Sequence, residues 1–75
     1  RRLRLTFDGT KTDAPIISQM VLSCQAPVNI IFADTKEYEG IIYGHMIIEL
    51  PNDEHQASKI ITWLKNSPVT WKEEV

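Results

Sequence analysis

The chain has 75 residues, which suits one domain, and a domain of this size buries only about 60% of the surface that its unfolded chain exposes. Its composition, 43% hydrophobic and 24% charged, is typical of a globular protein and argues against a disordered chain or one that crosses a membrane. A net charge of −2 gives no basic surface for nucleic acid, and a single cysteine excludes an internal disulfide and any cysteine-based metal site. We therefore expect one domain over residues 1–75, without a metal or a nucleic-acid partner. Because it begins Arg1-Arg2-Leu3, without an initiator methionine, we expect it to be part of a longer protein.

The first third of the chain predicts a strand and then a helix. Residues 3–7 alternate between apolar and polar side chains, as a half-buried strand does, and Asp8-Gly9 predicts the turn that ends it. From Asp13 the apolar spacing becomes that of one helical face, with Asp13 as the N-cap and Pro15 in the first turn. The residues of that face are Ile16, Ile17, Met20, Val21 and Cys24.

The middle of the chain predicts a hairpin. Residues 28–33 and 41–50 are apolar runs of strand length, and the charged segment 34–40 predicts the turn between them. Asn29 is unusual near the start of such a strand, because the short amide of asparagine competes for backbone hydrogen bonds.

The last third predicts a second helix and a closing strand. Asn52 is placed to cap the helix, and acidic residues 53–54 suit the positive end of the helix dipole. The apolar face of this helix consists of Ala57, Ile60, Ile61 and Leu64. Pro68 prevents the helix from continuing, and residues 69–75 predict an edge strand.

The element order is βαββαβ, which is that of the ferredoxin-like split βαβ arrangement. In this α+β fold of two layers, a four-stranded antiparallel sheet carries both helices on one face. The other face of the sheet, here called the open face, is left to solvent, a ligand or a partner.

Strand alternation assigns each strand residue to one face of the sheet. We expect to find on the helix side Leu3, Leu5, Phe7, Val28, Ile30, Phe32, Met46, Ile48 and Leu50. We expect to find on the open face Arg4, Thr6, Asn29, Ile31, Ala33, Ile41, Tyr43, His45 and Ile47. The apolar members of this face would form a patch that a soluble monomer seldom leaves uncovered.

A homodimer packed sheet to sheet, or a flanking domain, would cover that patch. For the homodimer we expect interface contacts from Ile31, Ala33, Ile41, Tyr43, His45 and Ile47. Asn29 would then lie at a partly apolar interface, where its amide either caps the strand or contacts a small ligand.

Three stretches of the sequence carry a resemblance to a known family. VNIIFAD (28–34), EYEGIIYGHMIIEL (37–50) and ASKIITWLKNSPVTW (57–71) resemble, in this order and spacing, the NIL domain, which is named for an Asn-Ile-Leu motif. That motif appears here as Asn29-Ile30-Ile31, with Ile where the name has Leu. The opening LRLTFDGTKTDAPIIS also resembles the first strand and helix of the family, whereas Glu73 stands where its closing strand tends to be apolar.

The resemblance implies the C-terminal regulatory domain of the ATP-binding subunit of a bacterial methionine ABC importer, on the cytoplasmic side of the inner membrane. It implies that two such domains pair through their sheets, that L-methionine binds at their interface, and that accumulated methionine holds the importer in a resting state, which is called transinhibition. Carried over by position, Asn29 is the first choice for a ligand contact. We expect the methionine side chain to lie against Ile31, Ile47 and Tyr43.

The remaining partners implied are the ATPase domain and the membrane permease of the parent transporter. Because the chain has no GxxxxGK[ST] phosphate loop, ATP and Mg²⁺ are expected only in that ATPase domain, and no cofactor is expected here. We do not expect this chain to be an enzyme, since His45 and His55 fall on different elements without a partner spaced for a triad.

Two other functions agree with the same residues. One is a dimerisation module that uses the open face and binds no ligand. The other is an amino-acid-binding domain of the ACT type attached to a metabolic enzyme. Ligand sites of that type usually involve a glycine-containing first loop, for which Asp8-Gly9 is the candidate here.

Overall fold

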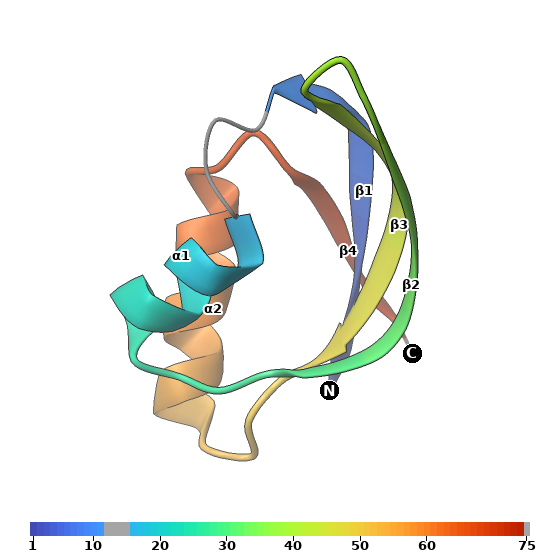
Figure 1. The fold of residues 1–75 in the computed structure, drawn as a ribbon. Helices are drawn as coiled ribbons and strands as arrows, with labels where there is room; N and C mark the ends of the chain where they lie inside the picture. Colours follow the sequence, from blue (N-terminus) through green and yellow to red (C-terminus); the bar gives the residue numbers. More distant parts are fainter. Residues whose placement is uncertain (12–15, 75) are drawn as a thin grey trace.

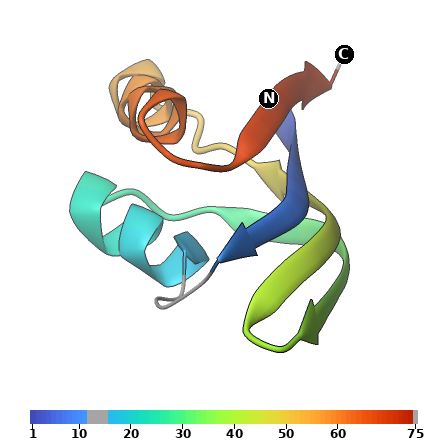
Figure 2. The same cartoon turned by 90° about the horizontal axis from the view of Figure 1, so that it is seen from above.

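The computed structural model describes residues 1–11 and 16–74. Its elements, in chain order, are β1 (Arg2–Lys11), α1 (Ile16–Cys24), β2 (Asn29–Tyr38), β3 (Ile41–Glu49), α2 (Glu54–Lys65) and β4 (Thr70–Glu74). The strands form one antiparallel sheet in the order β2-β3-β1-β4, and both helices lie on one side of it (Figures 1 and 2). The predicted ferredoxin-like fold is confirmed. The start of β1 and the end of β4 lie side by side, so the two ends of the chain are close together.

The first strand is longer than the sequence predicts. β1 continues through Asp8-Gly9 to Lys11, although this dipeptide predicted a turn. The register against β3 shifts between Asp8 and Thr10, so Gly9 is absorbed as a bulge and the pairing resumes beyond it.

The hairpin of β2 and β3 also differs from the prediction. Residues 34–38, predicted as a turn because they are charged, belong to β2, and Tyr38 pairs with Ile41. The connection is the dipeptide Glu39-Gly40, whose φ angles are 52° and 79°. Positive φ at both central residues is what a tight type I′ hairpin turn requires, and it matches the twist of the two strands.

Both helices have the apolar faces that the sequence predicts, and the cap of α2 differs from the prediction. Asp13 and Pro15, predicted to begin the first helix, lie outside the described residues. The N-cap of α2 is Asp53 and not Asn52: its carboxylate accepts hydrogen bonds from the amides of His55 (2.8 Å) and Gln56 (3.3 Å). Both residues are good N-caps, so the sequence alone does not choose between them.

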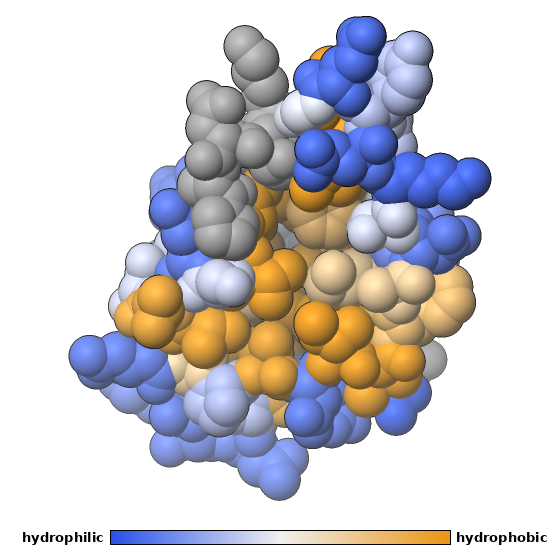
Figure 3. Space-filling model, in the orientation of Figure 1, coloured by the Kyte–Doolittle hydropathy of each residue, from blue (hydrophilic) through white to orange (hydrophobic). Residues whose placement is uncertain are grey.

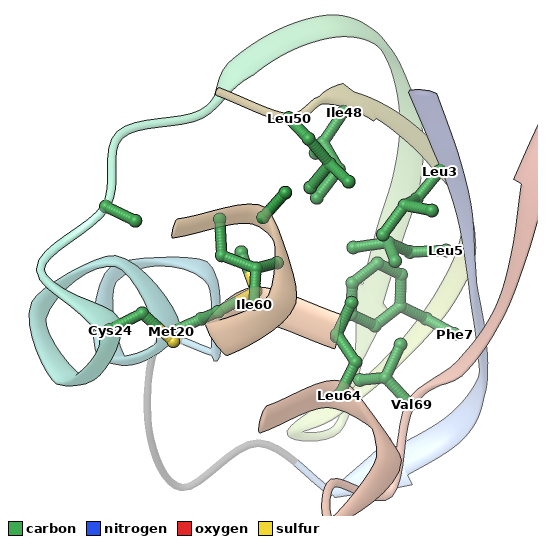
Figure 4. Packing of buried hydrophobic residues seen from close by; sticks show 12 residues of the cluster. Leu3, Leu5, Phe7, Met20, Cys24, Ile48, Leu50, Ile60, Leu64 and Val69 are labelled. Atoms are coloured by element: carbon green, nitrogen blue, oxygen red, sulfur yellow. The ribbon is translucent and has the colours of Figure 1, made fainter. Parts of the chain in front are cut away.

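The core lies between the helices and the sheet (Figure 4). It consists of Leu3, Leu5, Phe7, Met20, Cys24, Ala26, Ile48, Leu50, Ala57, Ile60, Leu64 and Val69. The alternating residues of β1 and the predicted faces of both helices therefore meet, as the pattern indicates.

A tight ion pair accounts for Glu73, the polar residue in the closing strand. Arg1 donates two hydrogen bonds to its carboxylate, at 2.9 and 3.0 Å, and a third to Glu54 of α2 at 3.3 Å. The hydrogen bond from Arg1 lowers the pKa of Glu73 and raises that of Arg1. A carboxylate at this exposed end of the sheet is thus satisfied by the opposite end of the chain.

A bulge in β2 shifts its register by one residue, so each later residue of β2 lies on the opposite face from the one that strict alternation predicts. Ile30 pairs with Ile48 and Phe32 pairs with Ile47, so Ile31 and Phe32 together oppose a single residue of β3. The predictions for Phe32 and Ala33 are therefore wrong. Phe32 lies on the open face beside Ile47, and Ala33 lies on the helix side beside Met46.

Candidate functional site

The open face of the sheet is the candidate functional site, and the strand register arranges it in rows. The register places the following residues there: Arg2, Arg4, Thr6 and Asp8 of β1; Asn29, Ile31, Phe32, Asp34, Lys36 and Tyr38 of β2; Ile41, Tyr43, His45, Ile47 and Glu49 of β3; Thr70, Lys72 and Glu74 of β4. Residues opposite one another on neighbouring strands are close enough for their side chains to interact. The face is polar over β1 and β4. Its large apolar side chains all lie on β2 and β3, where the polar residues Asp34, Lys36 and His45 lie among them.

We call the apolar part of this face the apolar half. It consists of Ile31, Phe32, Tyr38, Ile41, Tyr43 and Ile47. Phe32 is 51% exposed and Tyr38 is 70% exposed, which is unusual for side chains of this size. Several large apolar residues exposed together on one surface mark an interaction site more often than a solvated face.

The edge strand β2 carries much of that exposure. All ten of its residues are exposed, so neither helix covers it. Leu22 on α1 is likewise 77% exposed. The helix layer packs over the other three strands and leaves β2 available on both faces.

Two hollows lie outside the open face. A hollow of about 370 Å³ between α1 and β2 is lined by Ile17, Ser18, Val21, Leu22, Val28 and Ile30. Figure 3 shows hydrophobic side chains gathered around a hollow between the helix layer and the sheet. A groove of about 840 Å³ between α1 and α2 contains Trp63, Lys59 and Cys24. Neither hollow includes Asn29, Ile31, Tyr43 or Ile47, the four predicted ligand contacts.

Asn29 begins β2 at one end of the open face. It is exposed, and its amide nitrogen donates a hydrogen bond to the Glu49 carboxylate across the strand pair, at 3.3 Å. The asparagine that looked out of place in the sequence therefore has a carboxylate neighbour. Residues of the apolar half begin one row further along the sheet.

The structure brings together three of the four predicted ligand contacts. Ile47 pairs with Phe32 one row from Asn29, and Ile31 is the bulge residue next to that pair. Tyr43 lies six residues along β3 from Glu49, the partner of Asn29, which is a distance of about 20 Å. Within one copy of the chain, Tyr43 and Asn29 are thus too far apart to contact the same amino acid.

His45, predicted at the interface, lies in the middle of the open face. Its ring nitrogen Nδ1 is 3.5 Å from the Thr6 hydroxyl, and Asp34 lies opposite on β2. Sequence reasoning missed two other charged residues, Arg2 and Glu49, which share a row with Asn29. Their sequence positions are far apart, and only the register of three strands makes them neighbours.

The described residues contain no group of three or more His, Cys, Asp or Glu side chains placed to hold a metal ion. Cys24 is buried, and its thiol donates to the Lys59 carbonyl at 3.5 Å. Burial raises the pKa of this thiol, so it stays protonated at neutral pH. Within residues 1–11 and 16–74, no helix is long and apolar enough to cross a membrane.

Comparison with known proteins identifies the family of this chain. The model of the NIL domain family matches residues 1–73. The chain belongs to the NIL domain family. A methionine import ATP-binding protein of Lacticaseibacillus paracasei is 30% identical over 69 residues, and one of Bacillus cereus is 26% identical over 62 residues.

These NIL domain matches cover 92% and 83% of this chain but only 20% and 18% of the two relatives. The chain therefore spans about a fifth of their length. A solved structure is also similar: the C-terminal domain of an ABC transporter ATP-binding protein from Enterococcus faecalis, with 28% sequence identity and a TM-score of 0.82. The match covers 96% of this chain and 80% of that one.

Proposed function

We propose that this NIL domain is the L-methionine-sensing regulatory domain of the ATP-binding subunit of a bacterial methionine importer. Its family and the importer subunits that it resembles over a fifth of their length support this function. The observation that carries the proposal is the apolar half of the open face beside the Asn29 amide. An apolar surface with a few placed polar groups is what a small-molecule site requires.

In this proposal two copies pair through the apolar halves of their open faces about a two-fold axis. The contacts are Ile31, Phe32, Ile41, Tyr43, His45 and Ile47, with Phe32 taking the place that strand alternation gave to Ala33. Sheets pack in this way with their side chains interdigitated, and the pairing removes the exposed aromatic rings from water. The same pairing places one Asn29 from each copy in the dimer.

L-Methionine binds at the interface with its side chain against Ile31 and Ile47 and its polar end toward Asn29. Burying a side chain of this size contributes about 1.5–3 kcal/mol. A micromolar affinity corresponds to about 8 kcal/mol, so contacts to the charged groups must supply much of the binding free energy. Loss of the Asn29 partner should cost about 1–3 kcal/mol.

Regulation then follows from the pairing of the two domains. A ligand that binds both states of a transporter equally shifts neither, so methionine must favour one docking of the two sheets. That docking fixes the separation of the attached ATPase domains and produces transinhibition. ATP hydrolysis, Mg²⁺ binding and permease contact belong to the rest of the parent subunit, which is peripheral on the cytoplasmic face of the inner membrane.

Isothermal titration of the chain with L-methionine tests the proposal, with D-methionine and L-leucine as controls. The chain is used at a concentration where sedimentation shows a dimer. We expect heat from L-methionine alone and weaker binding by the Asn29→Ala variant. A folded dimer that gives no heat with L-methionine would contradict the sensing function and favour a dimerisation module without a ligand.

A further inference from the structure

We propose that a row of three side chains at one end of the open face holds the charged end of the amino acid. Glu49 binds the ammonium group, Arg2 binds the carboxylate, and Asn29 positions the Glu49 carboxylate through the hydrogen bond that its amide nitrogen donates, at 3.3 Å. This inference rests on the proposed function and names polar contacts of the same site. It adds two charged residues to the single asparagine that the family motif points to.

The strand register builds this row from three different strands. Glu49 of β3 lies between Arg2 of β1 and Asn29 of β2, and it is the pairing partner of both. Neighbouring strands are about 4.8 Å apart, so the row presents a cation, an anion and an amide within about 10 Å. An α-amino acid carries one cation and one anion on neighbouring atoms, so its charges can pair with both charged members of this row.

The ion pair between Arg2 and Glu49 is loose, which leaves room for a ligand. Its Nε–Oε2 distance is 3.7 Å, beyond hydrogen-bonding reach, and the two side chains are 54% and 39% exposed. Such exposed pairs contribute little to stability. Breaking this contact to admit a zwitterion therefore costs little, and charge-assisted hydrogen bonds to the ligand would take its place.

Other ion pairs at the same end of the sheet are tight. Glu74 lies beside Arg2 on β4, but its carboxylate accepts a hydrogen bond of 2.7 Å from Arg4. Glu73 is held on the helix side by Arg1. Within the described residues, the Arg2–Glu49 pair is thus the longest of the ion pairs.

The apolar half begins next to this row, at the distance that a methionine side chain needs. Ile47 lies two residues before Glu49 on the same face, about 6.7 Å along β3, and the bulge residue Ile31 lies next to its pairing partner Phe32. The amino acid can thus place its charged end on Glu49 and Arg2 and its thioether over Ile47. Three fixed contacts around one carbon atom distinguish the L-enantiomer from the D-enantiomer.

The test combines two variants with two modified ligands. Glu49→Gln removes the charge and keeps the size of the side chain, and Arg2→Gln replaces the guanidinium by a shorter neutral amide. We expect each to weaken L-methionine binding about ten-fold or more, since a hydrogen bond to a charged group contributes about 1.5–3 kcal/mol and 1.4 kcal/mol is ten-fold. Glu54→Gln and Lys65→Gln, on α2 and away from the open face, are the matched controls and should bind L-methionine within about two-fold of the unmodified chain.

The modified ligands show which side chain binds which charged group of the amino acid. N-Acetyl-L-methionine lacks the ammonium, so its binding should be the same to Glu49→Gln as to the unmodified chain. L-Methioninamide lacks the carboxylate, so its binding should be the same to Arg2→Gln as to the unmodified chain. Thermal unfolding of each variant verifies the fold. If L-methionine binds the unmodified chain and both Gln variants equally, this inference is wrong while the proposed function stands. If it does not bind the unmodified chain, both are wrong.

Discussion

Replacing Gly44 of β3 by alanine tests whether the close approach of β2 sets the geometry of the open face. Gly44 has a φ of +130°, a conformation that side chains rarely adopt. A Cβ atom there would lie 2.8 Å from the Cα of Thr35 and against the backbone of Asp34, both on β2. Backbone atoms of a paired strand cannot turn aside as a flexible side chain can, so the strands would have to separate.

The expected loss of stability has two parts. Holding a residue with a side chain at such a φ costs about 1–3 kcal/mol, and overpacking against fixed atoms costs about 1–3 kcal/mol more. The variant should therefore lose about 2–6 kcal/mol, and each kcal/mol lowers the melting temperature of a domain of this size by about 4–8 °C.

Gly40→Ala is the matched control, because Gly40 has a φ of +79° and nothing lies within 4 Å of the added Cβ. It should cost only the conformational part, about 1–3 kcal/mol. Urea unfolding followed by tryptophan fluorescence measures both variants. A Gly44→Ala variant that loses no more stability than Gly40→Ala would refute the argument from close packing.

Two further predictions concern the helix cap and the closing ion pair. Asp53→Ala should lower the free energy of unfolding by about 0.5–2 kcal/mol, because it leaves two amides of α2 without their acceptor. Asn52→Ala, the control, should change it little. Equal losses of stability in thermal melts of the two variants would contradict the assignment of Asp53 as the N-cap. Arg1 lowers the pKa of Glu73 in the folded state. The ion pair therefore stabilises the fold at pH values above the ordinary pKa of glutamate, and this stabilisation is lost as the pH falls through the folded-state pKa. Melting temperatures between about pH 6 and pH 3 should fall less steeply for Glu73→Gln than for the unmodified chain, and identical slopes would show that the pair contributes nothing.

Much of the fold can be predicted from the sequence because its periodicity is clear. The alternation of residues 3–7 and the spacing of the two helical faces predict a βαββαβ order, and each of these faces contributes to the core. The turn predicted over residues 34–40 is wrong for residues 34–38, which belong to β2, because charged residues on an exposed edge strand have the composition of a loop.

The bulge at Ile31 could not be predicted from the sequence. Ile30, Ile31 and Phe32 are all apolar, so alternation carries no information about which of them is the extra residue. The prediction for Ala33 fails for that reason. The sequence singles out Asn29 because asparagine is unusual in a strand, whereas Arg2 and Glu49 have the pattern of ordinary solvated charges. Their role as neighbours of Asn29 depends on the pairing of three strands, which is a tertiary property.

The dependence of dimer dissociation on methionine tests the central claim most directly, because a ligand bound at a shared interface must strengthen that interface. Sedimentation velocity over a range of chain concentrations gives the dissociation constant of the dimer, with and without L-methionine. At a ligand concentration of about 100 times its own dissociation constant, each occupied site should stabilise the dimer by about 2.7 kcal/mol. The dissociation constant of the dimer should therefore fall about 100-fold for each occupied site. D-Methionine should leave it unchanged. A dimer whose dissociation constant is the same with and without bound L-methionine would contradict a shared site between the two sheets.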